Sequence, residues 1–305
     1  MASPELENAP QIEHLARKVR AQINYVSTDS KINRRFVAPG RECNTGTYEF
    51  HTVDIRDGRP FKEQISLDTY GFELVEAPTD VSNFFDKAEV DSKYPAEMTK
   101  LLKDITGADQ VVPLGWMTRT SGDLAQHQRP EEENYSHQGG VQPPAGEAHV
   151  DMTPDKAQIY ARMTYANAFP DGSGFSRFLA VSMWRCFSKP PQDMPLAICD
   201  ARSVKADEGV PNTMFIVDEL PDEQSMLGEM EGEDQAPAAA IFHYQPEHRW
   251  WYFSDMQGDE VLIFKFHDSD PDRAMRAMHT AFHDPSFEHA NERESIEFRF
   301  FAFFN

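Results

Sequence analysis

Seven short runs of strand-forming residues dominate the second half of this chain. They are rich in β-branched and aromatic residues, and turns rich in Pro, Gly or acidic residues separate them. The runs are FSRFLAVSMW, PLAICD, TMFIVDEL, AAIFHYQ, RWWYFSDM, EVLIFKFH and SIEFRFFAFF. Because no helical pattern lies between them, we expect a mainly β structure, either a sandwich or a barrel.

The length of the chain favours one domain. Its 305 residues can bury a sizeable core, and β barrels of this size commonly remain undivided. We therefore expect a single domain over residues 1–305. Within it, residues 1–110 are predicted to be an N-terminal elaboration of helices and hairpins, and residues 111–305 the β core with flanking helices.

Two N-terminal segments have apolar residues at helical spacing. The pattern predicts a peripheral helix over residues 10–22 and an amphipathic helix that Gly107 ends. The apolar positions are Ile12, Leu15, Val19 and Ile23 in the first segment and Met98, Leu101, Leu102 and Ile105 in the second.

Two polar stretches predict irregular structure. Residues 123–148 are charged and rich in Gly and Pro, which is typical of an exposed loop or lid rather than of packed structure. Residues 218–237 are acidic and predict a solvated, mobile loop.

Charge and cysteine content narrow the function classes. Lys and Arg total 29 against 51 Asp and Glu, and the formal net charge of −22 repels nucleic acids and anionic lipid. We therefore expect a small-molecule substrate, with no nucleic-acid or membrane partner, and homo-oligomerisation is left open. The three scattered cysteines, the polar N-terminus and the lack of a long apolar run favour a reducing, cytoplasmic location.

The first candidate metal ligands lie in the tripeptide His149-Val150-Asp151, directly after the Gly- and Pro-rich stretch. In an extended chain, side chains two residues apart share a face. The imidazole of His149 and the carboxylate of Asp151 would then make two-thirds of a facial triad, the arrangement that leaves open positions on iron(II). An isolated H-x-D also occurs by chance on exposed strands.

A third ligand would have to be a distant histidine. His279 is one candidate, and His267, His283 and His289 compete with it because each also lies before or near Arg293. His283 is the strongest rival, because a residue four positions along a strand points to the same side as His279.

Arg293 and Ser295 form the next candidate site. Arg293 lies 293 − 279 = 14 positions after His279, at the start of the last strand-like run. Its planar guanidinium suits the far carboxylate of 2-oxoglutarate, and Ser295 on the same strand face offers a hydroxyl. A surface ion pair with neighbouring glutamates is the alternative.

The order of H-x-D, distant His and Arg-x-Ser resembles the Fe(II)/2-oxoglutarate-dependent dioxygenases. More specifically, it resembles the fungal hydroxylase/desaturase family related to the hydroxylase component of cephamycin 7α-methoxylation. The similar segments cover most of residues 66–299: SLDTYGFELVEAPTDVSNFFD, LLKDITGADQVV, HVDMTP, MWRCFSKPPQDMPLAICDARSV, RWWYFSDMQGDEVLIFKFHDS, HTAFHDP and RESIEFR.

This resemblance implies a double-stranded β-helix, a cupin-like jelly-roll core. It implies that His149, Asp151 and His279 bind Fe(II), and it is what selects His279 among the histidines. Arg293 and Ser295 would bind 2-oxoglutarate, and dioxygen would be the oxidant. No catalytic residue beyond the metal ligands is expected.

Other implications of the resemblance are less specific. Arg185 is a tentative further 2-oxoglutarate ligand and Arg119 a tentative substrate ligand. The sequence departs from the family pattern at Ser182, Met183 and His267, and the interval of 279 − 149 = 130 residues implies insertions between core strands.

The implied reaction is oxidation of a small molecule by hydroxylation, desaturation or oxidative ring closure, in fungal secondary metabolism. Two alternatives stay open: a metal-dependent hydrolase or isomerase with the same triad, which gives Arg293 no role, and a non-catalytic binding protein on the same scaffold.

Overall fold

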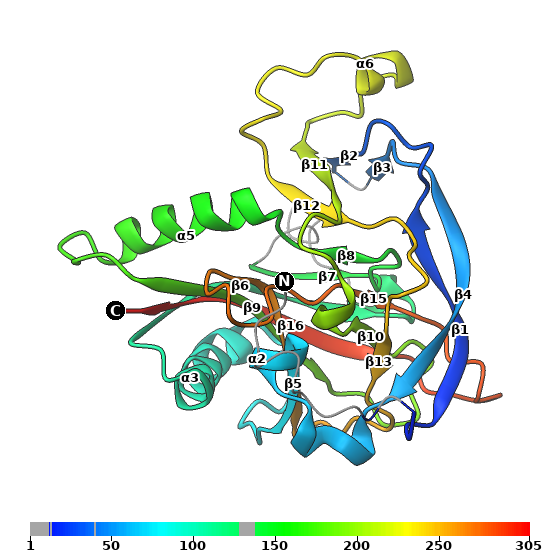
Figure 1. Ribbon diagram of the computed structural model, residues 1–305, viewed down its shortest axis with the longest axis vertical. Coiled ribbons are helices and arrows are strands. Elements are labelled where there is room, and N and C mark those ends of the chain that lie inside the picture. The colour runs from blue at the N-terminus through cyan, green and yellow to red at the C-terminus, as the bar shows by residue number, and fades with distance from the viewer. Residues whose placement is uncertain (1–11, 13, 40, 128–137) are drawn as a thin grey trace.

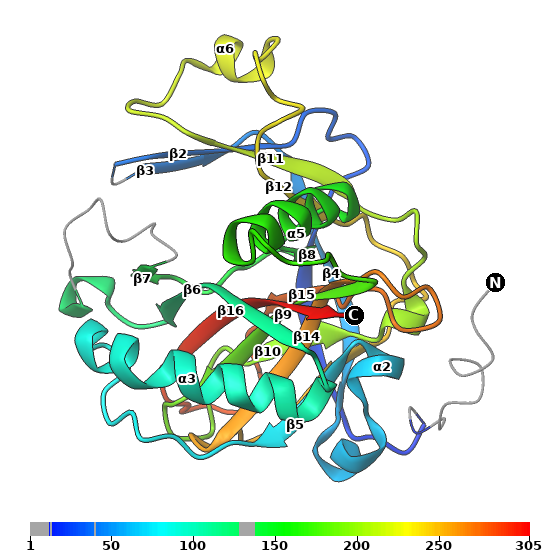
Figure 2. The same ribbon diagram turned by 90° about the vertical axis from the view of Figure 1, so that its left-hand side faces the viewer.

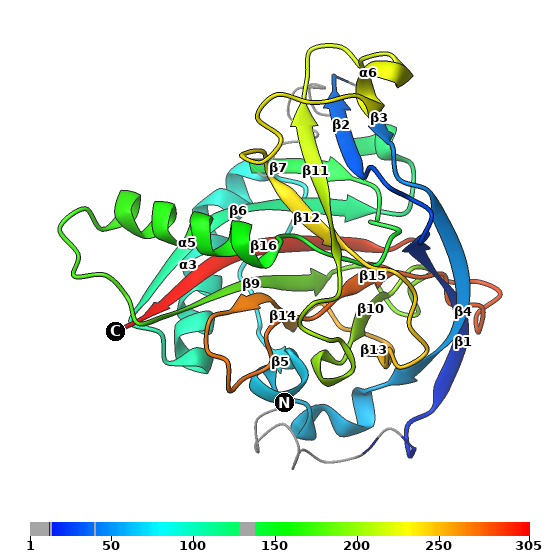
Figure 3. The same cartoon turned by 45° about the horizontal axis from the view of Figure 1, so that its top comes forward.

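The computed structural model describes residues 12, 14–39, 41–127 and 138–305. Its described strands form two sheets, one of ten strands and one of six (Figures 1 and 3). Side chains from both sheets contribute to the larger of two hydrophobic clusters, so the sheets face each other around it. The protein is mainly β, as the strand-like runs predict.

The ten-stranded sheet carries most of the N-terminal strands. In spatial order its strands are β1 (Lys18–Val26), β4 (Tyr48–Asp57), β13 (Trp250–Tyr252), β10 (Leu196–Cys199), β15 (His279–Ala281), β8 (His149–Val150), β12 (Ala238–Ile241), β11 (Val210–Ile216), β2 (Arg34–Ala38) and β3 (Arg41–Asn44). The short central strands β15 and β8 are neighbours although 130 residues separate their histidines.

The six-stranded sheet contains the C-terminal strand near its centre. Its order is β5 (Phe72–Glu76), β14 (Glu260–Asp268), β9 (Arg177–Cys186), β16 (Glu294–Phe304), β6 (Gln110–Thr120) and β7 (Gln138–Gln142). The helices around the sheets are η1 (Arg59–Gln64), α2 (Leu67–Tyr70), α3 (Lys87–Thr106), η2 (Leu124–His127), α5 (Pro154–Ala168), η3 (Ala201–Ser203) and α6 (Glu223–Leu227).

The two faces of β16 have different surroundings. Phe301 and Phe303 belong to the cluster between the sheets. The alternate side chains of the strand belong to a second cluster beneath α3: Ile296, Phe298, Phe300 and Ala302. Because strand side chains alternate, Ser295, Glu297 and Arg299 share the face of Phe301 and point between the sheets.

Helix α3 covers the outer face of the six-stranded sheet (Figure 2). Asp86 caps its N-terminus by accepting from two backbone N–H groups, and Gly107 ends it with φ 69°, a left-handed conformation that favours glycine. Four side chains spaced by four residues are buried against the sheet: Val90, Tyr94, Met98 and Leu102. The predicted amphipathic helix and its end are confirmed.

The predicted helix over residues 10–22 is wrong from Lys18 onward, because Lys18–Val26 forms β1. Val19 and Ile23 are four residues apart, a spacing that fits a strand face as well as a helix face. β1 pairs with β4 over nine residues and buries alternate side chains. Long-range pairing therefore decides the conformation.

The predicted loop over residues 123–148 is wrong in part. Gln138–Gln142 forms β7, which pairs in parallel with β6, and residues 139–142 are buried. Gly139 has φ 96°, a left-handed conformation that favours glycine. The Gly and Pro content that this segment needs is what predicted a loop. The central part of this loop, residues 128–137, lies outside the described residues.

The acidic stretch contains α6 and is mostly exposed, which agrees with a solvated segment. Within the described residues, no helix is long and apolar enough to cross a membrane.

The second hydrophobic cluster predicts a stability effect. Leu102 on α3 is fully buried, so Leu102→Ala leaves a cavity and should lower the free energy of unfolding by about 2–5 kcal/mol. Denaturant titration measures this change. The neighbouring exposed Lys103→Ala should change it by less than about 0.5 kcal/mol; equal effects of the two substitutions would contradict the packing of α3.

Candidate metal centre

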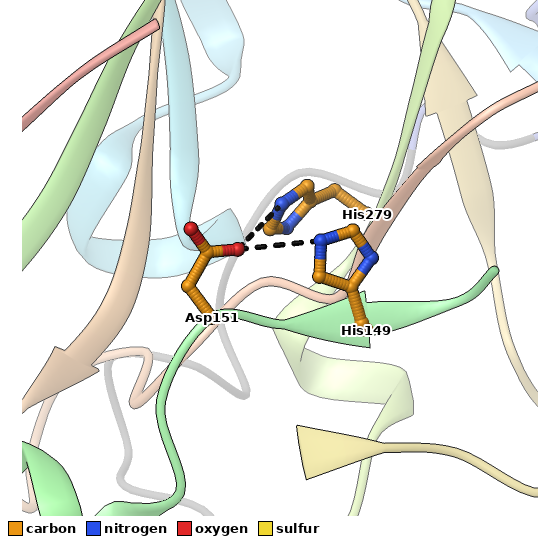
Figure 4. A group of neighbouring side chains, drawn as sticks. All are labelled: His149, Asp151 and His279. Carbon is orange, nitrogen blue, oxygen red and sulfur yellow. Dashed lines mark ion pairs between the residues drawn. The ribbon is translucent and has the colours of Figure 1, made fainter. Parts of the chain in front are cut away.

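His149, Asp151 and His279 lie together between the two sheets (Figure 4). His149 on β8 and His279 on β15 are direct cross-strand partners, and their ring centroids are 4.3 Å apart. Asp151 follows β8, and its Oδ1 lies 3.3 Å from Nε2 of His149 and 3.4 Å from Nε2 of His279. One ligand atom from each of the three lies within 4.8 Å of the others.

Backbone carbonyls set the orientation of both imidazole rings. Nδ1 of His149 is 2.8 Å from the Glu147 carbonyl oxygen, and Nδ1 of His279 is 3.3 Å from that of Ala277. A carbonyl only accepts, so Nδ1 donates the proton and the lone pair of a neutral ring is on Nε2. Both Nε2 atoms face Asp151, which is the tautomer and the direction that metal binding needs.

The ionisation states of the three side chains also favour the binding of a cation. Burial opposes ionisation of Asp151, but Arg299, His149 and His279 outweigh it and hold the pKa of Asp151 well below its usual range. Burial and the neighbouring His149 lower the pKa of His279. An ionised carboxylate thus lies beside a neutral imidazole lone pair, an arrangement that a bound divalent cation stabilises.

The structure brings one of the candidate distal histidines to the H-x-D pair. His283 and His289 are exposed. His267 is buried but stacks on Phe178, and burial lowers its pKa to about 4. Among the described residues, only His279 joins His149 and Asp151 in a possible metal-binding group.

A pocket opens beside this cluster. Its lining combines His149 and His279 with basic, acidic and apolar side chains from both sheets. The other lining residues are Arg119, Ala145, Trp184, Leu196, Phe264, Thr280, Ala281, Arg293 and Glu297.

Arg293 is a buried cation in this pocket, with 1% of its surface exposed. Its Nη1 donates to the Met194 carbonyl at 3.0 Å, and the guanidinium lies 5.7 Å from the ring centroid of Trp184. Among the described residues, its Nε has no hydrogen-bond partner, and neither has Oγ of the fully buried Ser295. Burial lowers the pKa of Arg293 to about 10, which still leaves it charged at neutral pH.

Arg119 also lines the pocket, but its donors are engaged. Nε and Nη2 lie 3.2 Å from the two carboxylate oxygens of Glu297, and Nη1 donates to the Pro143 carbonyl at 2.8 Å. The pocket therefore contains two arginines in different states, because Glu297 neutralises Arg119 while Arg293 has no ion pair within the described part of the chain.

The structure does not bring Arg185 to the pocket. Its guanidinium donates to the Tyr94 hydroxyl at 3.1 Å and to the carbonyls of Gly258 and Ala77 at 2.6 and 2.8 Å. Arg185 is adjacent to Trp184 on β9, so their side chains point to opposite faces. It therefore lies beneath α3, and we do not retain it as a 2-oxoglutarate ligand.

Sequence reasoning missed Arg299 and Glu297. Nε of Arg299 lies 2.7 Å from Oδ2 of Asp151, and its Nη2 lies 2.6 Å from Oε1 of Glu297. A signal was available, because Arg293, Ser295, Glu297 and Arg299 are polar residues at two-residue intervals, and from Ile296 onward apolar residues alternate with them.

Comparison with known proteins shows the family to which the chain is related. Residues 23–303 match the family described as oxidoreductase/YMDC permease-like domain. The chain is 31% identical to the hydroxylase/desaturase efuI of Hormonema carpetanum, over 84% of each chain. It is 30% identical to the Fe(II)/2-oxoglutarate-dependent dioxygenase nvfI of Aspergillus novofumigatus, over 87% of each.

A solved structure extends the similarity to three dimensions. The iron and α-ketoglutarate-dependent endoperoxidase NvfI superposes with a TM-score of 0.71 at 27% identity, over 94% of this chain and 98% of its own. The fold and the site thus define an oxidoreductase with a non-haem metal centre. The chain belongs to the fungal hydroxylase/desaturase family of Fe(II)/2-oxoglutarate-dependent dioxygenases.

This membership confirms the predicted enzyme class and the need for Fe(II), 2-oxoglutarate and dioxygen. It does not favour a hydrolase, an isomerase or a non-catalytic protein. The relation to the cephamycin 7α-methoxylation hydroxylase component stays a prediction.

The position of Arg185 yields a test. Arg185→Met removes the donors of three hydrogen bonds in a buried site and should lower the free energy of unfolding by about 3 kcal/mol, measured by denaturant titration. The affinity for 2-oxoglutarate should stay within about twofold, because Arg185 faces away from the pocket. Loss of that affinity at unchanged stability would restore Arg185 as a ligand.

Proposed function

We propose that His149, Asp151 and His279 hold Fe(II), and that Arg293 with Ser295 holds 2-oxoglutarate. One observation supports both assignments: a buried arginine, which pairs with no carboxylate of the described residues, shares a pocket with the two histidines. A buried guanidinium without a counter-ion is costly, so an anionic ligand is expected beside it. The dicarboxylate that this family uses supplies that anion.

The donor set fits Fe(II). Two imidazole nitrogens and one carboxylate oxygen lie within 4.8 Å of one another beside a pocket, and this is the donor set of the facial triad of non-haem iron oxygenases. Bound there, iron with 2-oxoglutarate supplies the oxidising power of the reaction, as 2-oxoglutarate and dioxygen are converted to succinate and carbon dioxide.

The side chains of the protein bind and orient the co-substrate. Arg293 can donate to the far carboxylate of 2-oxoglutarate through Nε, and Ser295 on the adjacent inward position can donate its hydroxyl proton. This anchoring would point the keto-acid end of the co-substrate toward the triad, since His149 and His279 line the same pocket.

Apolar side chains would exclude water from the reacting centre. The ring of Phe264 lies 4.5 Å from that of His279, and Trp184 and Leu196 form further walls of the pocket. A lining that excludes water protects a strong oxidant from side reactions and strengthens the charged contacts inside the pocket.

The substrate is a small organic molecule, as the named relatives suggest. Hydroxylase, desaturase, dioxygenase and endoperoxidase are the activities in those names. We propose that this chain performs one such oxidation, by hydroxylation, desaturation or ring closure, in fungal secondary metabolism.

We further propose that the two facing sheets form a double-stranded β-helix core within a single domain of residues 1–305. The facing sheets and the solved relative support this arrangement. The free thiols of Cys43, Cys186 and Cys199 fit a reducing compartment, and we propose the cytoplasm.

The role of Arg293 can be tested before any substrate is known. Anaerobic addition of Fe(II) and then 2-oxoglutarate to the apo-protein should produce the visible charge-transfer band of a chelated keto acid. Arg293→Ala should abolish the band at 2-oxoglutarate concentrations that saturate the parent, because the charged anchor is lost. Arg177→Ala, at an arginine that pairs with Asp268 instead, should keep it. An unchanged band in Arg293→Ala would remove this residue from the site.

The ligand assignment predicts loss of activity without loss of fold. His149→Ala and Asp151→Ala should each reduce iron-dependent 2-oxoglutarate consumption to background, measured as succinate formation, while circular dichroism stays unchanged. His283→Ala, at the exposed rival histidine, should keep full consumption. Full turnover in Asp151→Ala would refute the proposed centre.

A further inference from the structure

Four charged side chains form a continuous row of ion pairs from the pocket to the candidate metal centre. Arg119 contacts Glu297 at 3.2 Å, Glu297 contacts Arg299 at 2.6 Å, and Arg299 contacts Asp151 at 2.7 Å. All four side chains are only 12–14% exposed. The charges alternate in sign, so each is neutralised by its neighbours.

The positions of these four residues on their strands place the charged groups next to one another. Glu297 and Arg299 occupy successive inward positions on β16, and Arg119 lies on the neighbouring strand β6, opposite Ser295. Asp151 belongs to the other sheet, directly after β8. The contact between Arg299 and Asp151 therefore joins the two sheets at the metal centre.

A backbone irregularity in β6 lies opposite Arg299. The register between β16 and β6 shifts between Arg299 and Phe300, and the residue opposite Arg299 is Gly115, with φ 128°. β-Bulges often re-aim side chains beside active sites. Glycine allows this conformation and places no side chain beside the guanidinium of Arg299.

The row of ion pairs also keeps the carboxylate of Glu297 ionised. Burial raises the pKa of Glu297, but Arg119 and Arg299 outweigh burial and lower it to about 2. An ionised Glu297 can hold Nη2 of the Arg299 guanidinium while Nε of the same group contacts Asp151.

The two oxygens of Asp151 have different surroundings. Oδ2 is the atom nearest Arg299, whereas Oδ1 is the atom that faces Nε2 of both histidines. A carboxylate held in this way can offer Oδ1 to a metal and cannot readily rotate to offer both oxygens.

We propose that Arg299, itself held by Glu297, is a positioning residue that fixes Asp151 as a one-oxygen ligand of the metal. This inference rests on the proposed ligand role of Asp151. Arginine suits the task because its planar fork reaches two carboxylates at once, whereas the single ammonium of lysine does not. Partners that orient metal ligands typically contribute about 10–100-fold to metal affinity.

The test is the affinity of the apo-protein for Mn(II), a redox-inert substitute for Fe(II), measured by titration calorimetry without 2-oxoglutarate. Arg299→Gln should weaken Mn(II) binding about 10–100-fold with unchanged circular dichroism. Arg299→Lys keeps the positive charge but not the planar guanidinium, and should weaken Mn(II) binding at least about fivefold. The lysine variant carries the test if the glutamine variant does not fold.

The matched control is Arg177→Gln. Arg177 makes a two-point contact with the buried Asp268, at 2.9 and 2.7 Å, on the same sheet but outside the metal centre. This variant should bind Mn(II) within about twofold of the parent. An equal loss of affinity in Arg177→Gln and Arg299→Gln would reflect general loosening of the sheet and would overturn the positioning role.

Asp151→Ala separates failure of this inference from failure of the proposed function. If Asp151→Ala loses Mn(II) binding while folded Arg299→Gln and Arg299→Lys bind like the parent, the metal centre stands and Arg299 has no positioning role. If Asp151→Ala itself binds Mn(II) like the parent, the proposed centre is wrong and the inference falls with it.

Discussion

Burial of charge between two β-sheets is the constraint on which this structure depends. A charged group removed from water needs a partner, and most of the charged side chains in this space have one. Asp151, Arg299, Glu297 and Arg119 satisfy one another in an unbroken row. Arg293 differs, because no carboxylate of the described residues pairs with it. This unbalanced charge lies where we propose that the dicarboxylate co-substrate binds.

The C-terminal strand β16 combines stability and chemistry in one element. Its outward side chains pack beneath α3 and stabilise the six-stranded sheet. Its inward side chains change along the strand from polar, at Ser295 and Glu297, to aromatic, at Phe301 and Phe303. A central position in the sheet, paired with β9 and β6 on either side, holds these groups in a fixed geometry.

Local patterns predicted those parts of the fold in which neighbouring residues decide the conformation. Helix α3 has its apolar stripe, its cap and its terminal glycine within one segment, and it was predicted correctly. β1 and β7 were predicted wrongly, because their conformations come from pairing with distant strands. Val19 and Ile23 suit either structure, and only β4 selects the strand.

The sequence by itself determined which chemical groups were available and at what local spacing. The H-x-D pair and the Arg-x-Ser pair each have the two-residue spacing that puts side chains on one face of an extended chain. Tertiary structure decided which distant groups meet. It placed His279 rather than His283 opposite His149 and turned Arg185 away beneath α3. It also gave Arg293 no counter-ion from the part of the chain that the structure describes. The physical reason is that the type of a side chain is local, whereas its partners, burial and ionisation depend on segments that lie far away in the sequence.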